Sequence, residues 1–207
     1  MKKVSVFSHP KFKYFGLGVT TNRLDLSPSV VFVSGFRFNY FKLKVNPFSI
    51  NAEQNYKVGF QGKQLDVSNQ GVINNFPASS NSYYSILSSA AIKNTGILLG
   101  KLVPLSQANL SKTLSNREVP FCMFIGAGYA IRELYWGLQI TNYSGASSSN
   151  YWAKNSNQSW TGPEVEVGLF LPLKVFFIQA GTSAIFDASK SAPFISFSTA
   201  IGYLRKK

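Results

Sequence analysis

The 207-residue sequence has a single cysteine, a single histidine and few charged side chains, which make up 14% of the chain. One cysteine, Cys122, can form neither an internal disulfide nor a cluster of metal thiolates. His9 is the only side chain that could serve as the base of a Ser–His site, and it precedes the first expected strand. We therefore expect no catalytic residues, no metal ligands and no cofactor.

Long apolar runs are also missing. No run reaches the roughly 18 residues of a transmembrane helix, and no stretch near the start has the roughly 7–15 apolar residues of a signal peptide. Numbering from a mature chain, or a truncated start, would account for the second absence.

Acidic residues are scarce, which gives a formal net charge of +13. Nucleic-acid binding requires Lys and Arg clustered on one face, but here they are spread from Lys2 to Lys207, with clusters only near the two ends. A basic chain is attracted equally well to an anionic lipid surface. The charge distribution therefore predicts no nucleic-acid partner.

Aromatic residues are abundant, with 18 Phe and 10 Tyr, and large and small residues alternate. Between Val119 and Ile131 the odd positions are mostly large and apolar, whereas the even positions include Gly126, Gly128 and Ala130. Segments 165–171 and 195–203 repeat the pattern. A period of two residues indicates β-strands.

The alternation predicts strands at about 12–20, 29–38, 40–48, 82–93, 119–140, 158–171, 174–185 and 194–204. Tight connections at Asn39 and Pro172–Leu173 alternate with the longer connectors 21–28, 49–81, 141–157 and 186–193. Short and long connectors alternate in this way in outer-membrane barrels. We expect residues 1–11 to precede a single domain, 12–207, in which 94–118 is an insertion with a short helix in "LSQANLSKTLSN".

The composition of the two strand faces indicates the solvent. A soluble sandwich would carry Lys, Glu and Thr on its outer face, but here the second face carries Gly, Ser and Ala. Small side chains suit a narrow lumen, and closure satisfies every backbone group in lipid. We predict an all-β fold, a closed antiparallel up-and-down transmembrane β-barrel of about eight strands, with ten as the alternative.

This fold predicts that strand 194–204 pairs with strand 12–20. It also predicts that large side chains face lipid, namely Val165, Val167, Leu169, Ile195, Phe197 and Ile201, and that the lumen face holds Glu166, Gly168, Ser196 and Ser198.

Charged side chains on the small-residue face are Arg37, Lys42, Lys44, Arg132, Glu164 and Glu166. Because an isolated buried ion is costly, we expect a charge network in the lumen formed by Arg37, Arg132, Glu164 and Glu166, with Arg132 paired to one of the two glutamates. These charges have two interpretations: they fill the lumen, or they line a path for protons or a solute. An aromatic girdle at the membrane surfaces is predicted from Tyr135, Trp136, Trp152, Trp160 and Tyr203.

The segments "FIGAGYAIRELYW", "YWAKNSNQSWTGPEVEVGLFLPL", "FFIQAGTSAIF" and "ISFSTAIGYLRKK" resemble a family of outer-membrane β-barrel proteins of Bacteroidota, over about 119–204. The sequence departs from that family at its end, Leu204–Lys207, which lacks a terminal aromatic residue, and at Ala200, which replaces a glycine. The resemblance implies the outer membrane of a Gram-negative bacterium. The implied partners are the lipid bilayer, lipopolysaccharide and a protein of an outer-membrane assembly.

The predicted function is that of a small, non-enzymatic outer-membrane protein with a structural, binding or accessory role. Two alternatives stay open at this point. One is a soluble lectin-like sandwich that binds through Trp152 and Trp160, and the other is a lipid-modifying outer-membrane enzyme. Solubility without detergent would favour the sandwich.

Overall fold

The computed structural model describes residues 12–22, 29–46, 56–68, 70–77, 81–105, 119–145 and 147–206. In these ranges the chain forms ten β-strands: β1 (Phe12–Thr21), β2 (Ser29–Phe36), β3 (Asn39–Val45), β4 (Tyr56–Val58), β5 (Leu65–Asp66), β6 (Ser82–Pro104), β7 (Cys122–Asn142), β8 (Ser148–Pro172), β9 (Phe176–Ile185) and β10 (Phe194–Lys206). Within the same ranges, no helix is long and apolar enough to cross a membrane.

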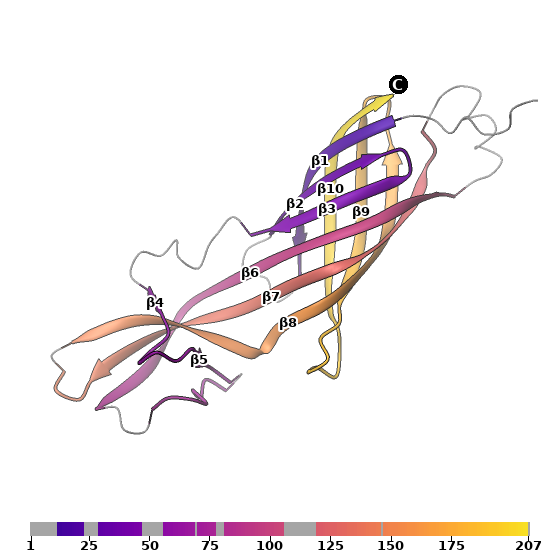
Figure 1. The fold of residues 1–207 in the computed structure, drawn as a ribbon. Helices are drawn as coiled ribbons and strands as arrows, with labels where there is room; N and C mark the ends of the chain where they lie inside the picture. The colour runs from indigo at the N-terminus through magenta and orange to yellow at the C-terminus, as the bar shows by residue number, and fades with distance from the viewer. Residues whose placement is uncertain are drawn as a thin grey trace, which may run out of the picture.

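Eight of the strands close into a ring in the order β1, β2, β3, β6, β7, β8, β9, β10 (Figure 1). The last strand pairs antiparallel with the first, from Phe12 opposite Lys206 to Thr21 opposite Phe197. This confirms the predicted closure and the predicted fold of about eight antiparallel strands. Closure leaves neither β1 nor β10 with a free edge, so the backbone groups of the ring find their partners within it.

The two faces of the ring follow the alternation of the sequence. Outside, Val167 is 45% exposed, Phe197 57% and Ile201 61%, whereas inside, Glu166 is 4% and Ser196 1% exposed. The other predicted outward residues, Val165, Leu169 and Ile195, are exposed too, and Ser198 is buried. The predicted sidedness is confirmed, and it is the reverse of a soluble sandwich, in which the large apolar faces are buried.

Small residues on the inner face leave space for aromatic side chains. Any side chain at Gly126 would collide with the Tyr40 hydroxyl, and any side chain at Gly35 would collide with the ring of Tyr14. Tyr14 of β1 therefore lies against the backbone of its neighbour β2, and Tyr40 of β3 reaches past β6 to the backbone of β7. This close approach explains why bare backbone and large aromatic residues occur together in the sequence.

Three strands continue far beyond the ring (Figure 1). The pairing of β3 with β6 ends at Lys44 and Gly96, and the pairing of β8 with β9 ends at Glu164 and Ile185. Past these points β6, β7 and β8 pair with one another, over 82–95, 131–142 and 148–163. We call this part the extension. At about 3.3 Å a residue it projects roughly 40 Å.

Two strand boundaries in the structure differ from those expected from the sequence. β6 runs to Pro104, so residues 94–104 are strand rather than insertion, because Ile97 and Leu99 keep the outward apolar alternation. β8 begins at Ser148, so residues 148–157 are strand rather than loop. The expected loop 49–81 contains β4 and β5. Residues 1–11, and residues 106–118 with most of the expected short helix, lie outside the described residues.

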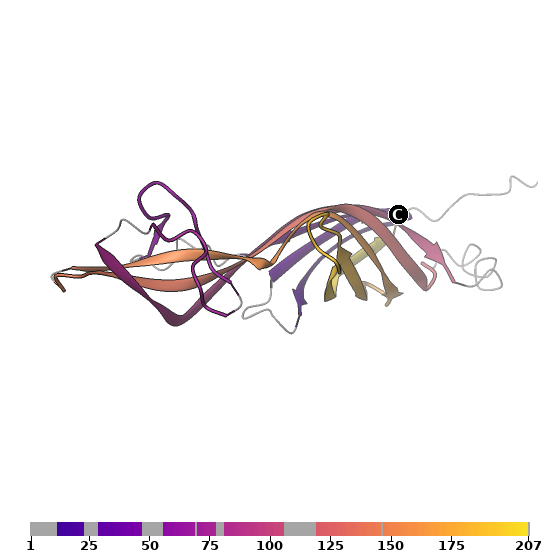
Figure 2. The same ribbon diagram turned by 90° about the horizontal axis from the view of Figure 1, so that it is seen from below.

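The extension has an apolar core of its own. Strands β4 and β5 pair in parallel with β8, and the segment 56–77 folds over the three long strands (Figure 2). The buried residues of this core are Leu65, Val67, Ile73, Leu138, Ile140 and Ala153. On the opposite face Tyr56 stacks on Trp152, with ring centroids 4.3 Å apart. The extension is therefore a packed unit and not a bare hairpin.

Candidate functional site

Aromatic rings fill the lumen near the end of the ring where the short turns lie. Phe170 of β8 stacks on Phe177 of β9 at 5.0 Å, and Tyr14 of β1 contacts both rings. Phe12 and Phe124 belong to the same buried cluster. Four strands thus contribute rings to one apolar layer, which blocks the lumen at this level.

A charged layer lies next to the aromatic layer. The Tyr40 hydroxyl donates a 2.6 Å hydrogen bond to Glu166 Oε1, and Lys42 Nζ forms an ion pair with Glu166 Oε2. One step further along the same strands, Lys44 pairs with Glu164. All four charged side chains are 2% exposed or less. Because β6 and β7 separate β3 from β8 in the ring, both pairs span the lumen.

Polar residues of β9 and β10 complete this layer. Ser198 lies 3.5 Å from Lys42 Nζ, and the hydroxyls of Ser183 and Ser196 are 2.9 Å apart. Two cations facing two carboxylates make the layer electrically neutral. Such an arrangement locks β3 to β8, because either charge alone would be buried without compensation.

Arg132 lies in a separate layer toward the extension. Its guanidinium donates a 2.8 Å hydrogen bond to the Gln158 carbonyl and lies 4.2 Å from the centroid of the Phe194 ring. Trp160 packs on Phe194 at 5.1 Å. An arginine and two aromatic rings therefore occupy the lumen mouth at the base of the extension.

The structure changes the expected charge network. Within the described residues the ion-pair partners of Glu164 and Glu166 are Lys44 and Lys42, where the sequence predicted Arg132. Arg37 lies in the turn between β2 and β3, with φ of 56°, and its guanidinium lies over the Phe36 ring at 5.1 Å. The two lysines and the two glutamates share an i, i+2 spacing, which fits two successive pairs but does not say that β3 faces β8.

The expected aromatic girdle is distributed over three regions. Tyr135, Trp136 and Trp152 belong to the extension, where Trp152 is 1% exposed, and Trp160 lies at the lumen mouth. Of the five, Tyr203 lies on the outer wall, with 55% exposure. The stretch around 135–152 carries aromatics because it has its own core to fill, which alternation alone does not reveal.

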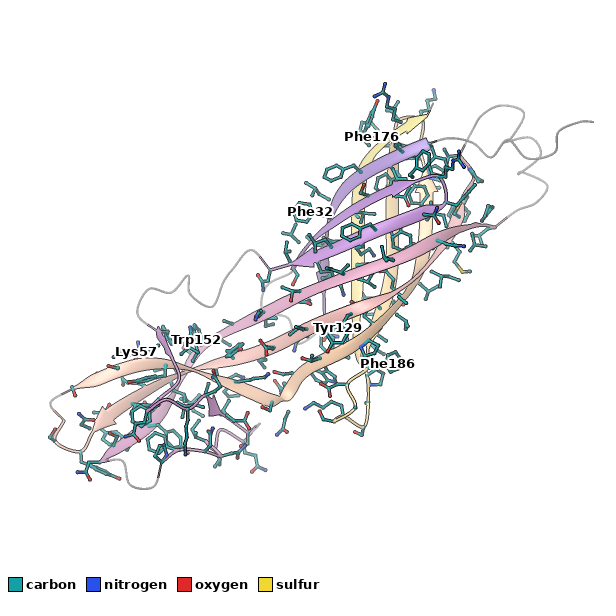
Figure 3. All side chains as sticks on the ribbon, in the orientation of Figure 1. Phe32, Lys57, Tyr129, Trp152, Phe176 and Phe186 are labelled. Atoms are coloured by element: carbon teal, nitrogen blue, oxygen red, sulfur yellow. The ribbon has the colours of Figure 1, made fainter. Side chains whose placement is uncertain are left out.

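Other aromatic residues occupy the outer wall at the two ends of the ring. Phe176 and Phe186 lie at opposite ends of β9 and are 52% and 47% exposed (Figure 3). At the short-turn end Phe36 and Phe121 are exposed as well. Aromatic residues near both rims are typical of barrels that cross a bilayer.

Carboxylates fasten the extension and the loop beside it. Glu133 accepts hydrogen bonds from Lys154 at 2.8 Å and from Tyr135 at 3.0 Å. Burial raises the pKa of Glu133, but these two hydrogen bonds and the nearby positive charges outweigh it, so the pKa lies below its ordinary value. Asp66 accepts a 3.0 Å hydrogen bond from the Ser156 backbone amide.

The pKa of Asp66 is also lower than its ordinary value. Burial raises the pKa of this carboxyl, and hydrogen bonds from Ser156 and Asn74, with the charge of Lys154, lower it further than burial raises it. Asp187, in the connection between β9 and β10, accepts from the Thr161 amide at 2.8 Å. Hydrogen bonds from Ser189, then from Thr161, hold the pKa of Asp187 below its usual value. These three carboxylates have structural roles in which the charged form is the stable one.

Metal-ligating side chains do not gather in the described part of the chain, where no group of three His, Cys, Asp or Glu residues could hold an ion. Cys122 is buried, and its thiol lies 3.2 Å from the Pro120 carbonyl. His9 lies outside the described residues.

Among solved structures, the chain matches the crystal structure of Neisserial surface protein A (NspA). The match covers 97% of this chain and 98% of that chain, with 13% sequence identity and a TM-score of 0.36. No family model matches the sequence, and no curated protein matches it. The resemblance to a Bacteroidota family therefore stays a prediction.

Proposed function

We propose that this chain is a non-enzymatic protein of the outer membrane of a Gram-negative bacterium, in which the ring anchors the extension outside the cell. The observation that carries the proposal is the closed ring whose outer face is mostly large and apolar while its inner face carries small, aromatic and ion-paired side chains. A bilayer requires that every backbone group be satisfied within the protein, and closed rings of strands meet that requirement.

The filled lumen supports an anchoring role over transport. The aromatic layer around Phe170 and Phe177, and the ion pairs of Lys42 and Lys44, block the ring at successive levels. Eight-stranded barrels have interiors just wide enough to be filled by their own side chains. The proposal assigns the charged layer to stability and to fixing the strand register, not to a proton or solute path.

The ends of the ring support one orientation. Short turns occur at Arg37–Phe38 and at 173–175, at the end of the ring where β1 begins and β10 ends. The extension lies at the other end. Outer-membrane barrels have short periplasmic turns and long extracellular segments, so the proposal places the extension outside the cell.

The extension offers the binding surface of this proposal. Tyr83 and Tyr143 are exposed at its tip with ring centroids 6.0 Å apart, and Val58 and Val72 are exposed on the segment that covers it. Tyrosine is enriched in the centres of protein–protein interfaces. A protein partner of an outer-membrane assembly, or lipopolysaccharide next to the ring, is the partner that we propose.

Labelling of single cysteines on intact cells tests location and orientation together. Ser148→Cys places a thiol near the tip of the extension, and Lys174→Cys places one in the short turn between β8 and β9. A membrane-impermeant maleimide should label Ser148→Cys in intact cells. It should label Lys174→Cys only after the outer membrane is permeabilised.

The native Cys122 is buried, so the unmodified chain is the control and should stay unlabelled. Equal labelling of both variants in intact cells would contradict a ring that crosses the outer membrane. Labelling of Lys174→Cys alone would reverse the orientation and remove the proposed extracellular binding surface.

A further inference from the structure

A groove of about 850 Å³ crosses the outer wall of the ring from β6 to β10. Its floor is formed by two rows of residues that lie opposite one another on successive strands. One row runs through Leu99, Ala127, Val165, Ala184 and Ile195, and the other through Lys101, Ile125, Val167 and Thr182. Leu99 is 63% and Ile195 51% exposed, so the groove opens outward.

The groove exists because small side chains alternate with large ones on the outer face. Ala127 lies between Ile125 and Tyr129 on β7; on β9 Ala184 lies in the same row as Ala127, and Thr182 lies in the row of Ile125. Many of the other outward residues are large, such as Phe197 with 57% exposure. A hollow lined by apolar side chains would take a hydrocarbon chain rather than a polar ligand.

A cation, Lys101, marks one end of the groove. This lysine is exposed, lines the groove and lies opposite Asn39, the residue that follows the short turn between β2 and β3. The other end lies at Ile195, directly after the connection between β9 and β10. The groove therefore runs obliquely from the short-turn rim toward the rim that carries the extension.

The dimensions of the groove fit an acyl chain. Five neighbouring strands spaced about 4.8 Å apart span roughly 19 Å, and one leaflet contributes about half of a hydrocarbon core of roughly 30 Å. An acyl chain whose headgroup lies at the short-turn rim would therefore lie along most of the groove. A phosphate at that rim would meet the charge of Lys101.

We propose that this groove binds an anionic phospholipid of the leaflet at the short-turn end, with its phosphate on Lys101 and one acyl chain along Ala127, Thr182 and Ala184. The inference rests on the proposed function, because it requires that the wall face lipid. A lysine ammonium binds phosphate as a point charge. Lys101 thus selects the headgroup charge, and the small residues of the two rows accommodate the chain.

Native mass spectrometry of the full chain in detergent, titrated with phosphatidylglycerol or phosphatidylcholine, tests the site. The wild-type chain should bind one phosphatidylglycerol in preference to phosphatidylcholine. Lys101→Gln should weaken the binding of phosphatidylglycerol about fivefold, as loss of one cation near an anionic surface predicts. It should leave the binding of phosphatidylcholine unchanged. Ala184→Leu, which fills the groove, should weaken both lipids by about tenfold.

Two matched variants serve as controls. Ala180→Leu adds the same atoms to the outer face of β9 away from the groove, and Lys174→Gln removes a cation at the same rim. Neither should change lipid binding. Equal effects of Ala184→Leu and Ala180→Leu, or no effect of Lys101→Gln, would overturn the inference.

A second copy of the chain is the other possible occupant. A dimer that Ala184→Leu abolishes would overturn the inference in favour of that occupant. Every variant is also tested for insertion into vesicles. Normal insertion without lipid selectivity would remove this inference alone, whereas failure of the wild-type chain to insert would remove the proposed function.

Discussion

The ion pair between Lys42 and Glu166 gives the sharpest test of the filled lumen. Replacing Lys42 by methionine leaves the buried Glu166 carboxylate, whose side chain is 2% exposed, with the Tyr40 hydroxyl as its remaining short contact. Glu166→Gln keeps an acceptor for Tyr40 but leaves the Lys42 ammonium without its counter-charge. Breaking a buried pair from either side costs about 3–5 kcal/mol of unfolding free energy.

Removing both charges together should cost much less. In Lys42→Met combined with Glu166→Gln no uncompensated charge remains from this pair, and the introduced amide oxygen can still accept from Tyr40. Replacement of a whole buried pair by neutral side chains is often neutral. We therefore expect the double variant to be more stable than either single variant, with a coupling free energy of at least about 3 kcal/mol, the cost of one single variant.

The assay is urea unfolding of the chain refolded into lipid vesicles, followed by tryptophan fluorescence for the wild-type chain, both single variants and the double variant. The pair of Lys93 and Glu133 is the control, because Lys93 is 51% exposed and its Nζ lies 3.6 Å from the carboxylate. Lys93→Met should change stability by less than about 1 kcal/mol. Additive effects at Lys42 and Glu166, each below about 1 kcal/mol, would mean that water reaches the charges and that the lumen is open.

The wall of the ring was predictable because one physical demand determines it. Every ring strand must place a large apolar side chain outward, so the alternation around Val167 and Phe197 identifies both the strands and their faces. Closure of β10 on β1 follows from the intolerance of lipid for open strand edges. The predicted strand near the start, 12–20, accordingly agrees with β1 within one residue.

The extension was not predictable from alternation. Beyond Arg132 the strands leave the ring, so an outward apolar face is no longer required, and Trp152 and Leu138 are buried on opposite sides of the sheet. The register also shifts between Arg132 and Leu134, where β8 has extra residues after Asn155. Polar residues such as those at 156–159 indicate a loop by composition; they lie within β8 as the extra residues at this register shift.

The charged layer lies between these cases. Alternation predicts that four charged side chains face the lumen, namely Lys42, Lys44, Glu164 and Glu166. Which lysine pairs with which glutamate depends on the strands that face one another across the ring. That relation is set by the connection through β6 and β7, and the sequence contains no local signal for it.

Two further predictions separate the wall from the extension. Val167→Arg places a charge on the lipid-facing wall and should lower the unfolding free energy in vesicles by about 2–4 kcal/mol, whereas Ser148→Arg, near the tip of the extension, should have almost no effect; equal effects would mean that no bilayer contacts β8. The extension should lose stability in acid. The pKa values of Asp66 and Glu133 are lowered from 3.8 and 4.5 on folding, so their stabilisation is present above those values and is lost as pH falls through the lower folded values. The protection factors of the extension amides, which are corrected for the intrinsic pH dependence of exchange, should therefore fall below about pH 4.5, with those of the ring amides unchanged, and Glu133→Gln should flatten the profile. Protection factors in the extension that are independent of pH in this range would show that neither carboxylate is held by the contacts described above.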